Sequence, residues 1–184
     1  MRHKTIIIKS VLVFLSAYLI SLLVWIQIKD IYGYAVTATA SKLVAEVKNV
    51  RVEKIRQEKN IVYTSFCRTM RKEDMVVELA FRTSSYTFNV PLTFSIMASL
   101  SIFIIRRRRA FAEAALLLVL VHFIYVFSLG AEQLTELFMG KGIESISRFK
   151  FFMYQFLWGF TDNMLIRCEP FLIGFYMYIR FRRS

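Results

Sequence analysis

The sequence contains few of the residues that enzymes commonly use for chemistry. Its 184 residues include two cysteines, Cys67 and Cys168, and two histidines, His3 and His122. Two cysteines are too few for a disulfide framework, and two histidines cannot supply a histidine-rich metal site. The CxxC, HExxH, P-loop and GxGxxG patterns are also missing. We therefore expect no metal and no cofactor.

Acidic residues are scarce as well, with 13 Asp and Glu against 25 Lys and Arg, which gives a formal net charge of +12. A strongly basic chain can bind nucleic acid, but here the basic residues gather at the ends of apolar runs. The clusters are Arg2 with Lys4, then Arg106, Arg107, Arg108 and Arg109, and finally Arg180, Arg182 and Arg183. This positive-inside pattern predicts a lipid bilayer, and not nucleic acid, as the partner.

Proline (2) and glycine (6) are rare, whereas 57% of the residues are hydrophobic and 16% are aromatic. This composition excludes an ordinary soluble domain. A membrane-spanning helix needs about 20 apolar residues, and four runs approach that length: 6–28, 90–105, 110–129 and 160–179. The first run is longer than the core of a signal peptide and no small-residue cleavage site follows it directly, so we expect an uncleaved anchor.

Residues 29–88 form a polar segment between the first two runs. Residues 31–47 carry alanines and spaced apolar residues, which predicts a helix. In NVRVEKIR, NIVYTSFCRT and MVVELAFRT, apolar and polar residues largely alternate, and QEKN and RKED connect these stretches. Alternation is typical of half-buried strands, here with Val77, Leu79 and Phe81 on one face. We therefore predict a three-stranded antiparallel meander after the helix.

The predicted fold is an α-helical membrane protein with four transmembrane helices and a small extracytoplasmic helix plus three-stranded antiparallel β-meander. Its parts are an N-terminal transmembrane anchor (1–28), an extracytoplasmic α+β segment (29–88), and a three-span helical membrane domain (89–184) with an outer loop at 130–150. Residues 151–160 are expected along the outer interface, with a bend at Gly159. The arginine clusters place both termini and residues 106–109 in the cytoplasm.

Three ionisable residues, His122, Arg167 and Glu169, lie inside predicted spans at similar depth. Counted from the cytoplasmic ends, His122 and Arg167 lie about 18 Å deep and Glu169 about 15 Å deep, at the rise of an α-helix. A charge inside the membrane costs at least 2.5–3.5 kcal/mol, roughly, and normally faces a partner or a cavity. Glu169 is expected to meet His122, or a hydroxyl such as Ser16 or Ser99.

This predicted polar cluster is interpreted as a buried structural clamp, a functional polar pocket, or a contact with another protein's helices. Arg167 and Glu169 are two positions apart and point in different directions, so they cannot pair well with each other. Arg167 is expected to bind carbonyls or a carboxylate of a neighbouring span, and Arg167→Leu is expected to reduce the folded yield. Pro170 lacks an N–H and leaves the carbonyl of Ile166 free as an acceptor.

Cys168 offers a different chemistry. A thiol beside an arginine, with a histidine at equal depth, combines the residue types of a cysteine nucleophile, its base and an oxyanion stabiliser. Arg167 and Cys168 are about 100° apart on a helix, however, and no nucleophile motif surrounds them. A small buried thiol is the commoner meaning of such a cysteine. We predict no catalytic residue and keep Cys168 as the alternative nucleophile.

The arginine clusters also have two interpretations. They determine topology without any ligand, and the four arginines from Arg106 to Arg109 could in addition bind anionic lipid headgroups. Glu113 follows Arg109 by four residues, so we expect an ordinary ion pair on one helix face.

The order of parts resembles a known family. SSYTFNVPLTFSIMASL joins a tyrosine-containing strand end to a span that begins with Asn and Pro, and an aromatic-rich stretch leads into the last span. In both features the chain resembles the small exosortase-associated membrane proteins of Gram-negative bacteria.

The resemblance implies a non-catalytic accessory or assembly subunit of an inner-membrane complex, with an exosortase-like membrane protein as partner and protein sorting as the process. It also implies a multi-pass protein of the bacterial inner (cytoplasmic) membrane, with both termini inside. Two alternatives stay open. One is an intramembrane cysteine transpeptidase-like enzyme that uses Cys168, and the other is a transport subunit with an Arg167/Glu169 pocket.

Overall fold

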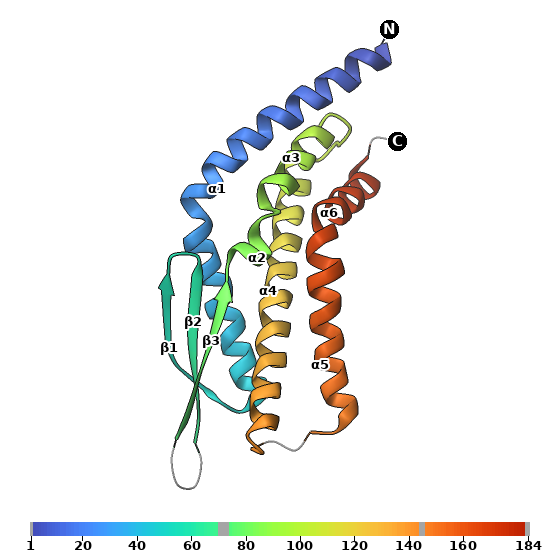
Figure 1. Ribbon diagram of the computed structural model, residues 1–184. Coiled ribbons are helices and arrows are strands. Elements are labelled where there is room, and N and C mark those ends of the chain that lie inside the picture. Colours follow the sequence, from blue (N-terminus) through green and yellow to red (C-terminus); the bar gives the residue numbers. More distant parts are fainter. Residues whose placement is uncertain (1, 70–73, 144–145, 183–184) are drawn as a thin grey trace.

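The structure, a computed structural model, describes residues 2–69, 74–143 and 146–182. It is mostly helical, with one small sheet at the side of a helical bundle (Figure 1). The elements in chain order are α1 (Arg2–Lys48), β1 (Arg51–Glu58), β2 (Ile61–Arg68), β3 (Met75–Arg82), α2 (Ser84–Thr87), α3 (Val90–Leu100), α4 (Arg107–Gly140), α5 (Arg148–Phe160), the π-helical turn η1 (Thr161–Leu165) and α6 (Ile166–Phe181).

Helix α1 is the longest element, with 47 residues, and at the rise of an α-helix it is about 70 Å long. Its N-terminal half crosses α3 and is tilted relative to α4, and its C-terminal half lies beside the sheet (Figure 1). The N-terminal half exposes its apolar side chains, whereas Val36, Ala40 and Val44 in the C-terminal half are buried. The predicted helix at 31–47 is therefore a direct continuation of the first apolar run.

Two of the described helices, α1 and α4, are long and apolar enough to cross a membrane. Helices α3 and α6 have 11 and 16 residues, fewer than the roughly 20 that a full crossing needs. The predicted run at 90–105 is helical only as far as Leu100. Its last residues pair with the end of α6 instead: Ile104 and Arg182 form a β-bridge, and the N–H of Ile105 donates to the carbonyl of Phe181 at 3.1 Å.

The sheet is an antiparallel meander in the order β1-β2-β3, which confirms the predicted strands and their pairing. Its inner face carries Val62, Thr64 and Phe66 of β2 and the three predicted residues of β3, Val77, Leu79 and Phe81, all buried. These side chains pack on α1 and α4, since half-buried strands need a second apolar layer. Residues 71–73 of the predicted RKED connection lie outside the described residues.

The outer loop expected at 130–150 is instead helical up to Gly140, because α4 continues through it. Leu134 and Phe138 are spaced by four and buried, while Glu132 and Glu136 point away from the core. Glu132 and Glu136 thus belong to the outer face of an amphipathic helix. The loop proper is short and lies between α4 and α5.

Residues 148–181 form one helical path beside α4 and α3, so α5 packs along α4 and leads directly into α6 (Figure 1). The expected bend at Gly159 is absent there, and the irregularity follows as the π turn at Thr161–Leu165. A π turn holds one residue more than an α turn and rotates the following helix by about 100°. This rotation lets Trp158 before the turn, Thr161 at its first position and Glu169 after it all face the bundle.

The π turn predicts an unusual tolerance to deletion. Removing Met164, an exposed residue of that turn, should leave a continuous α-helix in which α5 and α6 both keep their buried faces. We expect normal folded yield and little change in the thermal midpoint of the detergent-solubilised protein. Removing the similarly exposed Leu172 from α6 should rotate the residues after it by about 100°, displace the buried Met177 and abolish folding. Equal damage from both deletions would contradict this account.

Candidate functional site

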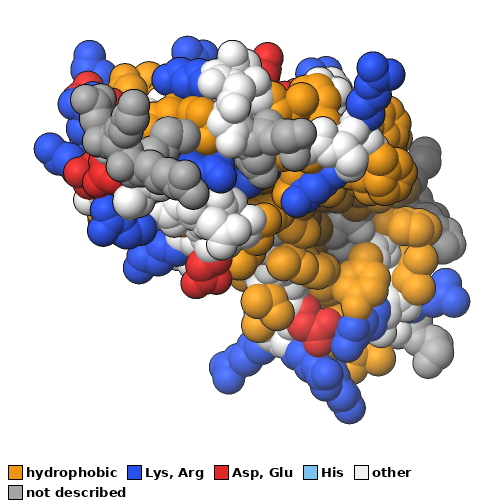
Figure 2. Space-filling model, turned by 90° about the horizontal axis from the view of Figure 1, so that it is seen from below, with side chains coloured by type: hydrophobic (Ala, Val, Ile, Leu, Met, Phe, Trp, Pro, Cys, Tyr) orange, Lys and Arg blue, Asp and Glu red, His pale blue; other side chains and the backbone are white. Residues whose placement is uncertain are grey.

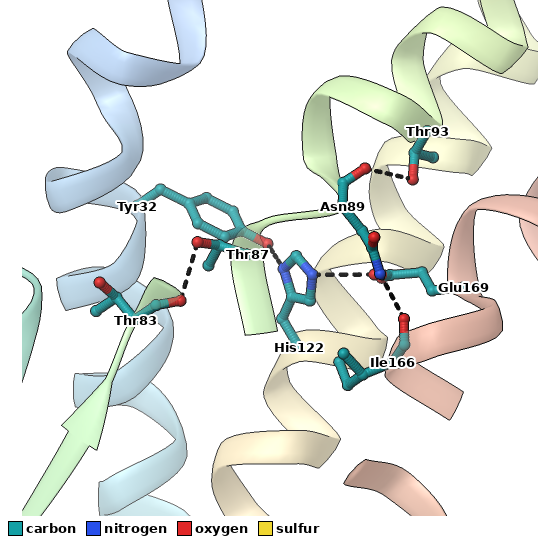
Figure 3. Close-up of polar contacts among 8 residues, drawn as sticks. All are labelled: Tyr32, Thr83, Thr87, Asn89, Thr93, His122, Ile166 and Glu169. Carbon is teal, nitrogen blue, oxygen red and sulfur yellow. Dashed lines mark hydrogen bonds and ion pairs between the residues drawn. The ribbon is translucent and has the colours of Figure 1, made fainter. Parts of the chain in front are cut away.

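The most buried polar cluster joins three helices through one histidine. The Tyr32 hydroxyl on α1 lies 2.7 Å from Nδ1 of His122 on α4. On the other side of the ring, Nε2 of His122 lies 3.3 Å from Oε2 of Glu169 on α6. Figure 3 shows the three side chains in line, with the imidazole between the phenol and the carboxyl group. The side chains of His122 and Glu169 are both 0% exposed.

A second contact holds α6 beside the start of α3. Because Pro170 has no N–H, the carbonyl of Ile166 lacks its partner within the helix. The side-chain amide of Asn89 donates to this carbonyl (Figure 3). The carbonyl of Asn89 in turn accepts from the hydroxyl of Thr93 at 3.1 Å. The acceptor expected from the sequence is therefore used by Asn89, the residue directly before α3.

Tyr86 packs against the other face of the cluster. Its ring lies edge-on to the imidazole of His122, with 5.5 Å between the ring centres. Its hydroxyl donates to the carbonyl of Gly33 at 3.0 Å and lies 3.0 Å from the hydroxyl of Thr37. Burial raises the pKa of the Tyr86 phenol to about 12, so it stays protonated and can keep donating. A Cβ on Gly33 would lie 2.5 Å from the side chain of Thr83, so only glycine fits there.

The chain Tyr32–His122–Glu169 can hold and move a proton. A protonated imidazole beside a carboxylate has the same net charge as a neutral imidazole beside a carboxylic acid. A proton can therefore shift between Nε2 and Oε2 without changing the net charge of the pair, as a buried site requires. The second carboxyl oxygen of Glu169, Oε1, is buried without a hydrogen-bond partner among the described residues.

The third member of the predicted cluster, Arg167, is not brought to the other two. Its side chain is exposed on the outer surface of α6 and makes no ion pair or hydrogen bond within the described part of the chain. Ser99, considered as a partner for Glu169, donates instead to the carbonyl of Ser10 on α1 at 3.1 Å. The cluster therefore consists of the buried His122 and Glu169 and the partly buried Tyr32.

Cys168 is exposed next to Arg167 and points away from the buried cluster. Both ring nitrogens of His122 are already engaged, one by Tyr32 and the other by Glu169. The imidazole has no nitrogen left for the thiol, so the arrangement does not assemble a cysteine–histidine pair. Within the described residues there is also no group of three or more His, Cys, Asp or Glu that could hold a metal ion.

The arginine clusters that are far apart in sequence meet at one end of the molecule. Glu113 on α4 pairs with Arg109 at 3.0 Å, as predicted, and also with Arg180 of α6 at 3.3 Å. A recess of about 410 Å³ lies there, and its polar lining consists of Arg106, Arg109, Arg180 and Arg182. Arg107 and Arg108 are exposed beside it, and Arg183 lies outside the described residues. The recess has the charge that an anionic headgroup needs.

Tyr32, Tyr86 and Asn89 were not among the residues singled out from the sequence. For the latter two a signal was available, because both lie in the SSYTFNVPL stretch that carries the family resemblance. Tyr32 lies in a polar-looking stretch directly after the first apolar run, and nothing in its neighbours indicates a buried contact.

These features define a helical membrane protein with a small antiparallel sheet and a buried polar contact between its helices. The chain belongs to the family of exosortase H-associated membrane proteins, which it matches over residues 4–181. The resemblance seen in the sequence is therefore confirmed. Neither the curated proteins nor the solved structures contain a match.

Removing the carboxyl group of Glu169 should destabilise the protein strongly. In Glu169→Ala, Nε2 of the fully buried His122 loses its partner, and breaking a buried pair in this way costs about 3–5 kcal/mol. We expect a large fall in folded yield and thermal midpoint in mild detergent, with a smaller fall for Glu169→Gln. The neighbouring exposed residue supplies the control, since Cys168→Ala should leave both quantities unchanged. A comparable loss in Cys168→Ala would argue against this assignment.

Proposed function

We propose that this protein is a non-catalytic accessory subunit of an inner-membrane complex and partners an exosortase-type protein-sorting enzyme. The match to exosortase H-associated membrane proteins over nearly the whole chain carries the proposal. Exosortase-type systems process exported proteins that bear a C-terminal sorting tag. An accessory subunit would assemble with or stabilise the enzyme that acts on the tag.

The arrangement of the buried cluster favours an accessory function over the two alternatives. An intramembrane cysteine enzyme needs a base close to Cys168, and His122 is occupied on both nitrogens. A transport subunit with an Arg167/Glu169 pocket needs the two charges in one cavity, whereas Glu169 is buried and Arg167 is exposed. The contacts of His122 instead support a structural clamp between helices.

The proposed topology has four membrane segments, α1, α3, α4 and α6, with both termini in the cytoplasm of a bacterial cell. Figure 1 supports it, because the N-terminus, the C-terminus and the loop between α3 and α4 lie at one end and the sheet lies towards the other. The exposed arginines 106–109 and Arg180 support a cytoplasmic position of the first end. The parts 1–28, 29–88 and 89–184 then correspond to an anchor, an outer segment and the main membrane domain.

The buried cluster belongs to the outer half of the membrane in this topology. His122 lies about 18 Å from Ala110 along α4, which is more than half of a hydrocarbon core about 30 Å thick. Tyr32 lies just past Ile28, where the exposed apolar surface of α1 gives way to Lys29 and Asp30. The tilt of α1 relative to α4 reduces the difference between the two counts, since a tilted helix needs more residues to reach the same depth (Figure 1).

The surface of the opposite end supports its placement outside the membrane. Figure 2 shows this end, with Lys and Arg side chains spread around the visible face and hydrophobic side chains exposed between them. Exposed charges on the sheet include Lys54, Arg56 and Glu58. Such a mixed surface is expected next to water, and its apolar parts are suited to contact with a partner.

The topology can be tested by labelling single cysteines in intact cells and in inverted membrane vesicles. In a background with Cys67→Ala and Cys168→Ala, we expect a cysteine at Lys54 to react with a membrane-impermeant maleimide from outside only. A cysteine at Arg107 should react only after inversion. Both native residues are exposed, so access depends on the side of the membrane alone. Labelling of both positions from one side would refute the proposed orientation.

The accessory function can be tested by complementation. Deleting the gene should strongly reduce the processing of exported proteins that carry the sorting tag, and the wild-type chain should restore it. Cys168→Ser should restore processing fully, because an accessory subunit does not use this thiol. Tagged exosortase H should retain the wild-type chain after extraction in mild detergent. Loss of processing in Cys168→Ser at normal membrane levels would favour the enzyme instead.

A further inference from the structure

The position of Arg167 calls for a partner from another chain. This residue lies on the exposed side of α6, two residues from the fully buried Glu169 and therefore at nearly the same depth. A guanidinium that faces hydrocarbon costs at least 2.5–3.5 kcal/mol, roughly, unless it finds an anionic or polar group. The described residues supply none, since Glu169 turns towards His122 on the other side of the helix.

Arg167 interrupts a long apolar face. Along α5 the rings of Phe152, Phe156 and Phe160 stack successively, with 6.3 Å and 6.1 Å between ring centres, and all three are exposed. Along α6 the exposed aromatic residues Phe171 and Phe175 continue beyond Arg167. We call these five phenylalanines and Arg167 the α5–α6 face.

The α5–α6 face is longer than the hydrocarbon core of the membrane. At helical rise, Phe156 lies about 36 Å from Arg180 at the cytoplasmic end, beyond a hydrocarbon core of about 30 Å. The rings of Phe152 and Phe156 therefore remain exposed on the outer side. By contrast, the exposed N-terminal half of α1 carries a single charge, Lys9, between Thr5 and Ile28, so lipid alone can cover it.

We propose that the α5–α6 face docks a membrane helix of the exosortase partner, and that an Asp or Glu on that helix pairs with Arg167. A carboxylate fits best because it accepts two parallel hydrogen bonds from a guanidinium, which combines charge with geometry. The apolar rings on both sides exclude water from the pair and strengthen it. This inference rests on the proposed accessory function and specifies the surface that carries it out.

The first test measures the affinity of purified variants for tagged exosortase H in mild detergent. Arg167→Leu should weaken binding by at least tenfold, roughly, because truncating one partner of a buried charge pair leaves the other unpaired. Arg167→Lys should lose less, since it keeps the charge without the bidentate geometry. Arg82→Leu, which removes an exposed arginine from the sheet, should bind as the wild type does. The thermal midpoint of Arg167→Leu alone should equal or exceed that of the wild type, and the lower folded yield expected from the sequence no longer applies, because Arg167 is exposed and has no partner among the described residues.

The second test identifies what covers the face. A photoreactive phenylalanine analogue at Phe156 should crosslink to exosortase H in cells, and the same analogue at the exposed Leu116 on α4 should not. An adduct between two copies of this chain, or adducts with phospholipid alone, would overturn the inference. So would unchanged binding in Arg167→Leu, which leaves the accessory function intact. If the wild-type chain itself fails to bind exosortase H, the proposed function falls as well.

Discussion

The relative placement of three helices depends on the two nitrogens of one imidazole. His122 is fully buried and binds Tyr32 through one nitrogen and Glu169 through the other, so it ties α1 and α6 to α4. Losing either partner would leave a buried polar group unpaired, which is costly. Tyr86 of α2 packs on the same imidazole and hydrogen-bonds to Gly33, one residue after Tyr32, so the short helix that follows the sheet is held at the same point.

Several features could be predicted because they depend on local sequence. The alternation around Val77, Leu79 and Phe81 indicated a strand with one buried face, and the structure buries all three. The spacing of Arg109 and Glu113 indicated their ion pair. Counting residues from the cytoplasmic ends placed His122 and Glu169 at similar depth, and the structure brings them into contact. The depth of a residue in the membrane depends only on its position along the helix, so counting residues was sufficient to predict it.

The direction in which a side chain points around a helix is harder to predict, and here the structure differs from the sequence-based predictions. The π turn at Thr161–Leu165 rotates α6 by about 100°, and this turns Arg167 outwards and Glu169 inwards. The residues of that segment do not indicate a π turn in the sequence. The turn results from the fit of α5 and α6 to the rest of the bundle. Similarly, the stretch around Glu132 and Glu136 was predicted as a loop because the buried positions Leu134 and Phe138 were not weighed against its charges. In both segments the tertiary contacts, and not the local sequence, determine the conformation.

The continuity of α1 has a mechanical consequence. Its 47 residues run without a break from the apolar half that faces the membrane to the half that supports β2 through Ser41 and Thr64. A rigid rod that pivots near its middle, where Tyr32 holds it against His122, moves its two ends in opposite directions. Bilayer thickness sets the tilt of a long apolar helix. A change in the tilt of the apolar half is therefore carried along the continuous helix to the half that supports the sheet.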